Sequence, residues 1–333
     1  MTSAKSKFAA LLAACVATTV SWVSPAAAQV SGRPIQGIYA GNDTLVFQHQ
    51  VALIGLERLG YIPKPLIAVD YPAVFLALSK GEADFTALYY TPLFEGSFEK
   101  VNGAEKLVRL GPMFQNALQG YLIDKKTADK YGIKSLDQMK DPKIAKLFDS
   151  QGDGKAHLTG CNAGWGCEGI IEHQMKAYDL QRTVTVDTGS YFALMASTIA
   201  RFKKGEPIFY WVWQPLWVNS VLVPGKDVEW LTVPYTSLPG GRQAKTVIPD
   251  GRNLGTGIND NWFLVNKEFA SKNPIATRFF EQVRIPIDDI SAENLKIYNG
   301  EKSQQDIRRH AEEWIAANRA KFDSWIENAK NAK

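Results

Sequence analysis

Two cysteines constrain this chain more tightly than any other pair of residues, because only five residues separate them. Cys161 and Cys167 enclose a short loop, and Trp165 stands inside it. Its neighbours, Gly164 and Gly166, can take positive φ and let the backbone approach another group closely. An apolar periodicity that begins at Cys167 predicts a helix. The loop therefore joins an indole ring to the free N–H groups of a helix N-terminus.

This loop combines two chemical groups that attract opposite charges. An aromatic face attracts a cation, whereas a helix N-terminus attracts an anion. A ligand that carries both charges, such as a betaine, would suit the loop. The alternative hypothesis is structural: the cysteines form only a staple, and the tryptophan packs beneath it. The rest of the chain has to decide between the two.

The N-terminal residues have the pattern of a secretory signal peptide. Two lysines precede the apolar residues 8–23, and small residues follow up to Ala28. We therefore expect residues 1–28 to be removed on export to the periplasm. Cleavage before Cys15, for lipid attachment, is an alternative that would leave only a short apolar core. The apolar run is too short for a spanning helix that persists in the mature chain.

Composition and motif content exclude several classes of protein. The formal net charge of +4 gives no basis for nucleic-acid binding. Of the three cysteines, Cys15 leaves with the signal peptide, and the even pair that remains predicts a disulfide between Cys161 and Cys167 in an oxidising compartment. An exported hydrolase is the alternative class, but it would need a nucleophile with a base or paired carboxylates, and such motifs are absent. We expect no enzymatic activity and no cofactor apart from the calcium considered below.

Short strands and helices alternate along the chain, which predicts an α/β fold of parallel βαβ units. At this length two lobes are expected rather than one core. Residues 120–126 and 261–267 are similar segments, and we interpret them as the two strands that carry the chain out of one lobe and back. Lobe 1 would then comprise residues 29–122 and 262–333, and lobe 2 residues 123–261.

Two further aromatic groups stand where predicted strands end. Tyr90 closes one strand, and ligands of open α/β sheets bind beyond such ends, although core packing explains an aromatic there equally well. Trp211 and Trp213 share one side of another strand. Three tryptophans within seven residues exceed what a core requires, because aliphatic residues fill a core without an indole N–H to satisfy. These residues favour an aromatic cage.

A polar loop before the cysteines contains half of a calcium-binding pattern. Oxygen side chains at Asp149, Gln151 and Asp153 precede Gly154, as in the first half of a calcium loop. The acidic residue expected at position 12 of such a loop is missing. One hypothesis is an Asx/Gly turn without metal. The other is a structural calcium ion held by Asp149, Gln151, Asp153 and Lys155.

Three segments carry a resemblance to a known family: residues 120–169, which include CNAGWGCEG, then RFKKGEPIFYWVWQPLWV at 201–218 and LVPGKDVEWLTVP at 222–234. They resemble the periplasmic glycine betaine/proline betaine-binding proteins of ABC importers. The resemblance implies a type II periplasmic binding protein fold, with two α/β lobes joined by a two-strand hinge. It also implies delivery of a small ligand to a membrane permease with its ATPase, and we expect a monomer.

The resemblance further implies which residues bind. In that family three tryptophans surround a quaternary ammonium group, and backbone amides hold its carboxylate. Carried over by motif, the ring positions are Trp165 and Trp213, and the amides are those of Gly166 and Cys167. We expect Trp211 to add a wall.

Two positions depart from the family pattern. Tyr90 replaces a tryptophan and keeps an electron-rich face. Phe94 replaces a histidine and cannot donate a hydrogen bond to a carboxylate. The missing charge-assisted hydrogen bond would contribute roughly 1.5–3 kcal/mol to the free energy of binding. The aromatic positions still imply a methylated ammonium ligand such as glycine betaine, proline betaine or choline, with trimethylamine N-oxide or carnitine as the alternative, and the missing histidine donor leaves the preferred ligand open.

Overall fold

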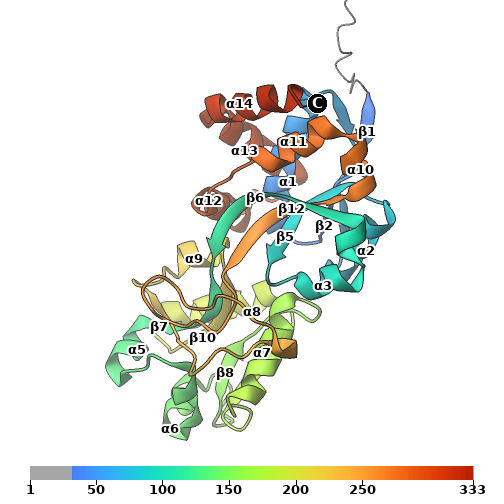
Figure 1. The fold of residues 1–333 in the computed structure, drawn as a ribbon. Coiled ribbons are helices and arrows are strands. Elements are labelled where there is room, and N and C mark those ends of the chain that lie inside the picture. The colour runs from blue at the N-terminus through green and yellow to red at the C-terminus, as the bar shows by residue number, and fades with distance from the viewer. Residues whose placement is uncertain (1–31, 333) are drawn as a thin grey trace, which may run out of the picture.

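The computed structural model describes residues 32–332, which form two α/β lobes, one above the other in Figure 1. The predicted signal peptide and Cys15 lie outside the described residues. Within residues 32–332, no helix combines the length and the apolar character needed to cross a bilayer.

The first lobe is discontinuous in sequence. Its N-terminal part contains β1 (Arg33–Ile35), β2 (Ile38–Ala40), the 3₁₀ helix η1 (Asp43–Leu45), α1 (Val46–Arg58), β3 (Tyr61–Pro63), β4 (Ile67–Val69), α2 (Tyr71–Lys80), β5 (Phe85–Thr91), α3 (Glu95–Lys100), α4 (Gly103–Lys106) and β6 (Leu107–Ala117). Its C-terminal part contains β12 (Asn259–Asn266), α10 (Lys267–Lys272), α11 (Pro274–Gln282), α12 (Ile287–Tyr298), α13 (Gln304–Ala317) and α14 (Arg319–Lys330).

The second lobe is formed by the chain between these two parts. Its elements are β7 (Gln119–Asp124), α5 (Lys125–Tyr131), η2 (Leu136–Lys140), α6 (Pro142–Ala145), η3 (Lys146–Phe148), β8 (Ala156–Thr159), α7 (Gly166–Ala177), β9 (Val184–Asp187), α8 (Tyr191–Lys203), β10 (Phe209–Trp213), α9 (Val218–Val221), β11 (Val228–Trp230) and η4 (Pro239–Gly241).

Strand pairing separates the two lobes. In the first lobe β12 lies between β5 and β6 and runs antiparallel to both, while β2 pairs with β4 in parallel. In the second lobe the order is β11-β7-β10-β8-β9. The predicted boundaries at 122/123 and 261/262 fall inside β7 and β12. The pairings place all of β7 in the second lobe and all of β12 in the first. We therefore infer that the chain crosses between the lobes at Leu118 and Ile258. The division into lobes stays a proposal.

Alternation along β10 divides the second lobe into two cores. Phe209 and Trp211 face the core that contains Tyr121, whereas Tyr210 and Val212 face the core on the other side of the sheet. This is the two-residue period of a strand buried on both faces. The last residue of β10, Trp213, is only partly buried and packs against both cores.

Candidate functional site

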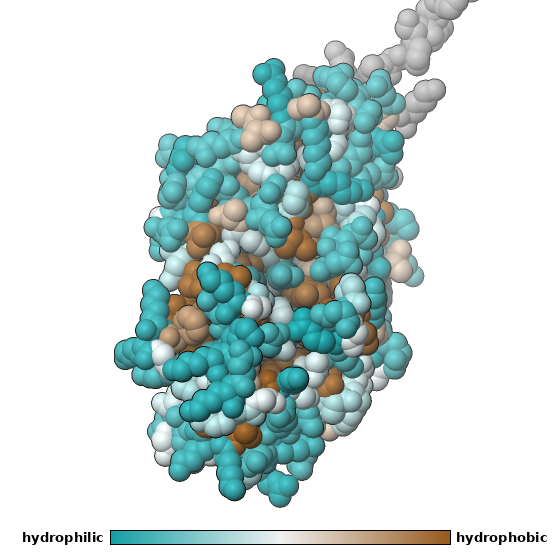
Figure 2. Space-filling view, turned by 90° about the vertical axis from the view of Figure 1, so that its left-hand side faces the viewer, coloured by the Kyte–Doolittle hydropathy of each residue, from teal (hydrophilic) through white to brown (hydrophobic). Residues whose placement is uncertain are grey.

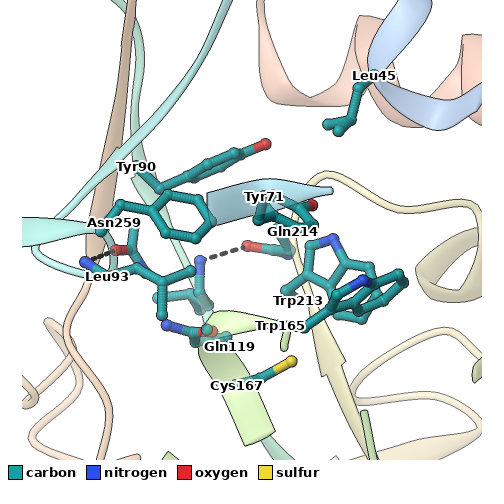
Figure 3. Close-up of a pocket in the computed structure, with 13 residues that line it drawn as sticks. Leu45, Tyr71, Tyr90, Leu93, Gln119, Trp165, Cys167, Trp213, Gln214 and Asn259 are labelled. Carbon is teal, nitrogen blue, oxygen red and sulfur yellow. Dashed lines mark hydrogen bonds between the residues drawn. The ribbon is translucent and has the colours of Figure 1, made fainter. Parts of the chain in front are cut away.

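A cavity lies between the two lobes and holds about 500 Å³ of empty space, the solvent at its mouth included. It is lined from the first lobe by Leu45, Tyr71, Tyr90, Leu93, Phe94 and Asn259, and from the second by Gln119, Trp165, Gly166, Cys167, Trp213 and Gln214, with Leu118 at the crossing (Figure 3). Several of these residues follow the carboxyl ends of strands, where α/β sheets bind ligands.

Two indole rings form the wall contributed by the second lobe. The centroids of Trp165 and Trp213 are 5.5 Å apart, and the rings are nearly perpendicular at 85°. Tyr191, at the start of α8, lies 4.8 Å from Trp213 and 6.1 Å from Trp165. Its hydroxyl donates to the carbonyl of Trp211 at 2.9 Å. Both indoles are therefore held in place by neighbours from their own lobe.

The cysteine loop orients the other half of this wall. The predicted disulfide between Cys161 and Cys167 is confirmed, with the two Cα atoms 6.2 Å apart. Gly164 has φ of +80°, and its N–H donates to the carboxylate of Glu168 at 2.7 Å. Helix α7 begins at Gly166, as the periodicity predicted within one residue. The N–H groups of Gly166 and Cys167 belong to its first turn, where a helix offers them no acceptor.

The first lobe contributes a wall of phenyl and phenol rings. Tyr71 stacks on Phe94 with centroids 5.2 Å apart, and Phe94 lies 6.3 Å from Tyr90. Tyr71 also meets Trp165 across the cavity at 6.0 Å. Burial raises the pKa of Tyr90 and that of Tyr71 far above the ordinary value for tyrosine. Both phenols are therefore neutral, and their rings offer electron-rich faces without a formal charge.

Three amide side chains, those of Gln119, Gln214 and Asn259, complete the lining, and two of them accept hydrogen bonds from backbone N–H groups. The N–H of Leu93 donates to the side-chain oxygen of Asn259 at 3.1 Å. The N–H of Leu118 donates to the side-chain oxygen of Gln214 at 3.2 Å. None of the 13 described residues that line the cavity is Asp, Glu, Lys, Arg or His. A cation can therefore be held there by aromatic faces, and an anion by backbone N–H groups.

The structure does not bring Trp211 to the cavity, so the expectation that it adds a wall is corrected. Trp211 is fully buried, and its ring meets that of Tyr121 at 4.8 Å in the core of the second lobe. It shares a side of β10 with Trp213, as predicted, but lies two residues further from the end of the strand. The depth along the strand decides which indole reaches the ligand side.

Tyr71 is a lining residue that the sequence analysis missed. It is the first residue of α2 and follows the parallel strand β4 after a single residue, Asp70. The rule that ligands lie beyond the carboxyl ends of parallel strands, which selected Tyr90, could have selected Tyr71 as well. The predicted positions Tyr90, Trp165, Gly166, Cys167 and Trp213 all line the same cavity.

The loop considered for calcium lies away from this cavity. Asp149 accepts backbone N–H groups of its own loop, which makes an Asx turn. The ligand atoms of Asp149, Asp153 and His157 lie within 4.8 Å of one another. An imidazole is not a ligand that calcium prefers, so the donor set fits calcium poorly, and the calcium site stays a prediction.

Comparison with known proteins matches this chain to a family of transport proteins. Residues 39–317 match the family described as the substrate binding domain of ABC-type glycine betaine transport system. The glycine betaine/proline betaine-binding periplasmic protein of Escherichia coli (strain K12) is 47% identical over 287 residues, 86% of this chain and 87% of that protein. The glycine betaine-binding periplasmic protein OusX of Dickeya dadantii (strain 3937) is 45% identical over 304 residues, 91% of each.

Solved structures share the fold. The glycine betaine/L-proline-binding protein of an ABC transporter from Borrelia burgdorferi superposes with a TM-score of 0.69 at 20% identity, covering 90% of this chain and 98% of that one. An ABC-transporter choline binding protein in complex with choline has a TM-score of 0.68 at 16% identity, covering 88% and 91%. The predicted two-lobe α/β fold is confirmed.

Proposed function

The chain belongs to the family of substrate-binding domains of ABC-type glycine betaine transport systems, and we propose that it captures a methylated ammonium compound between its lobes. This is a family of solute-binding transport proteins rather than of enzymes. One observation carries the proposal: rings from both lobes converge on a cavity that also contains the first turn of α7. The rings would hold the methylated cation, and the amides of Gly166 and Cys167 would hold an oxygen of the ligand.

The uncharged lining narrows the choice of ligand. Glycine betaine and proline betaine are zwitterions that use both the rings and the amides, and relatives are named for binding them. Choline uses the rings and offers only a hydroxyl to the amides. Because Phe94 supplies no donor, we expect the preference for a carboxylate to be modest. No observation favours trimethylamine N-oxide or carnitine, and both are included as probes in the experiment below.

The remaining steps of import follow from the family and are part of the proposal. Relatives are named periplasmic proteins, and we propose the same compartment for this chain. It would work there as a monomer without catalytic activity, and deliver its ligand to a membrane permease with an ATPase.

Calorimetric titration of the mature protein tests the cage. The probes are glycine betaine, proline betaine, choline, carnitine and trimethylamine N-oxide, and the variants are Tyr90→Ala, Trp165→Ala and Trp213→Ala. We expect micromolar or tighter binding of at least one methylated compound, and weaker binding by each variant. Trp211→Phe is the matched control, because this indole lies outside the cavity. Micromolar binding that survives all three alanine substitutions would reject the proposal.

A further inference from the structure

A second aromatic contact joins the two lobes outside the cavity. Helix α12 packs against α1 and η1 of the first lobe and also meets α9 of the second lobe, its neighbour below in Figure 1. There the rings of Trp217 and Tyr298 stack with centroids 3.9 Å apart and planes 14° from parallel. Figure 2 views the molecule from this side and shows hydrophobic residues gathered at mid-height between hydrophilic ends.

This contact continues to the cavity through one further ring. Phe192 stacks on Trp217 with centroids 6.2 Å apart at 28°. Phe192 also lies beside Trp165, with ring centroids 6.4 Å apart at 67°. A line of rings therefore runs from Tyr298 in the first lobe to the tryptophan that the cysteine loop presents to the ligand.

We propose that Tyr298 is a positioning residue for ligand binding, which stabilises the closed arrangement of the lobes by stacking on Trp217. Its two partners in the stack, Trp217 and Phe192, belong to the second lobe, so the stack is a contact between the lobes, and we expect it to be lost when they open. A contact that forms only in the closed state favours that state, and it therefore raises the affinity for every ligand that binds the closed state. The inference rests on the proposed function and adds a residue that does not touch the ligand.

The surroundings of Tyr298 separate this role from ordinary core packing. Its side chain is 42% exposed, whereas Trp217 is 4% exposed. Tyr298 is also the last residue of α12, where the helix ends. Replacing it removes a contact with the other lobe and leaves the core of its own lobe intact.

The test compares three variants, with glycine betaine and choline as probes. Tyr298→Ala removes the ring, and Tyr298→Phe keeps it. Tyr131→Ala is the matched control, because Tyr131 is 44% exposed and lies on α5, away from the first lobe. We expect Tyr298→Ala to weaken binding about two- to tenfold, as an aromatic pair is worth, through faster dissociation in stopped-flow measurements. Tyr298→Phe and Tyr131→Ala should bind as the wild type does.

Thermal unfolding without ligand supplies the readout for a merely structural role. We expect Tyr298→Ala to lower the unfolding temperature no more than Tyr131→Ala does. Wild-type affinity and dissociation rate in Tyr298→Ala overturn the inference, and so does an equal loss in Tyr298→Phe. Failure of the wild type to bind any methylated ammonium probe would instead overturn the proposed function, so the two failures are distinguishable.

Discussion

The two walls of the cavity offer different chemistry, although both are aromatic. The second lobe presents two indoles and the N–H groups of a helix first turn, and a disulfide holds that turn in place. The first lobe presents phenyl and phenol rings, two leucines, Leu45 and Leu93, and the amide of Asn259, whose oxygen accepts from the N–H of Leu93. Only the second lobe therefore addresses both charges of a zwitterion, and the first lobe covers the cation.

This difference indicates a division of labour between the lobes. The second wall is preorganised, since its rings pack on Tyr191 and its backbone is closed by a covalent bond. Preorganised groups lose little freedom when a ligand binds. We expect the second lobe to determine affinity and the first to determine how long the ligand stays enclosed.

The largest expected effect comes from removing one ring from each wall. Trp165→Ala should weaken binding of glycine betaine about a hundredfold, roughly 3 kcal/mol, because a central indole is lost. Tyr90→Ala should weaken it only about tenfold, because a phenol face attracts a cation less strongly. Calorimetry measures both. Equal losses would refute the division of labour, and Trp211→Phe should leave affinity unchanged.

The lobes should also respond differently to acid, beginning with the first lobe. Burial lowers the pKa of His49 to about 4, and its neutral ring accepts from the N–H of Ala87 at 2.9 Å. In the unfolded chain the imidazole of His49 has a pKa near 6.5, so on acidification it is protonated in the unfolded state before it is protonated in the folded state. Lowering the pH from 7 to 5 should therefore cost about 2 kcal/mol of the free energy of unfolding.

In the second lobe the corresponding effect has the opposite sign. Burial alone would lower the pKa of His157, but the hydrogen bonds and charges of Asp187 and Asp153 outweigh burial and raise the pKa. The stabilisation that protonated His157 gives the folded state is fully present below pH 6.5. It is lost as the pH rises through the pKa of His157 in the folded state. NMR titration of the imidazoles checks both signs. A His49 resonance that titrates near pH 6.5 would contradict the lowered pKa of His49.

Urea unfolding against pH connects these pKa values to stability. His49→Gln should remove most of the loss between pH 7 and pH 5. His157→Gln should instead steepen the loss on acidification, because it removes the contribution that acid supports. Parallel stability curves for the two variants would show that the lobes do not differ in this way.

The disulfide allows a test confined to one wall. The cysteines are six positions apart, and for so short a loop chain entropy predicts a stabilisation of about 2 kcal/mol. Replacing both Cys161 and Cys167 by serine should lower the free energy of unfolding by this amount and also weaken ligand binding. Urea unfolding with and without a reducing agent measures the first effect. Unchanged affinity would mean that the amides are held without the covalent bond.

The smallest expected effect concerns an ion pair in a second pocket beside the cavity, which shares Trp165 and Gly166 with it. Arg242, in the segment that returns to the first lobe, lies 3.3 Å from the carboxylate of Glu99, and both side chains are exposed, at 43% and 68%. Exposed pairs contribute at most about 1 kcal/mol and are screened by salt. Arg242→Ala should weaken binding less than about fivefold, and high salt should abolish the difference. A larger, salt-independent loss would make this contact comparable to the Trp217–Tyr298 stack.

The sequence predicted the second wall better than the first. Trp165, the cysteine pair and the start of α7 lie within a few residues of one another, so their relation is local and shows in the spacing. Tyr71 was missed, because its partners Phe94 and Trp165 are distant in the chain. Trp211 was assigned to the wall wrongly, because the two-residue period of a strand identifies a side of a sheet and not the depth along it.

The amino-acid sequence by itself determined the disulfide loop, the helix that begins beside it, the alternation of strands and helices, and the family. These features depend on interactions between residues close together in the chain and on motifs that are continuous in the sequence. Only the tertiary structure decided which rings meet, since strand order and the contact between lobes bring Tyr71, Tyr90 and Trp213 to one cavity and Tyr298 to Trp217. Such convergence depends on contacts between residues far apart in the chain, which no local pattern encodes.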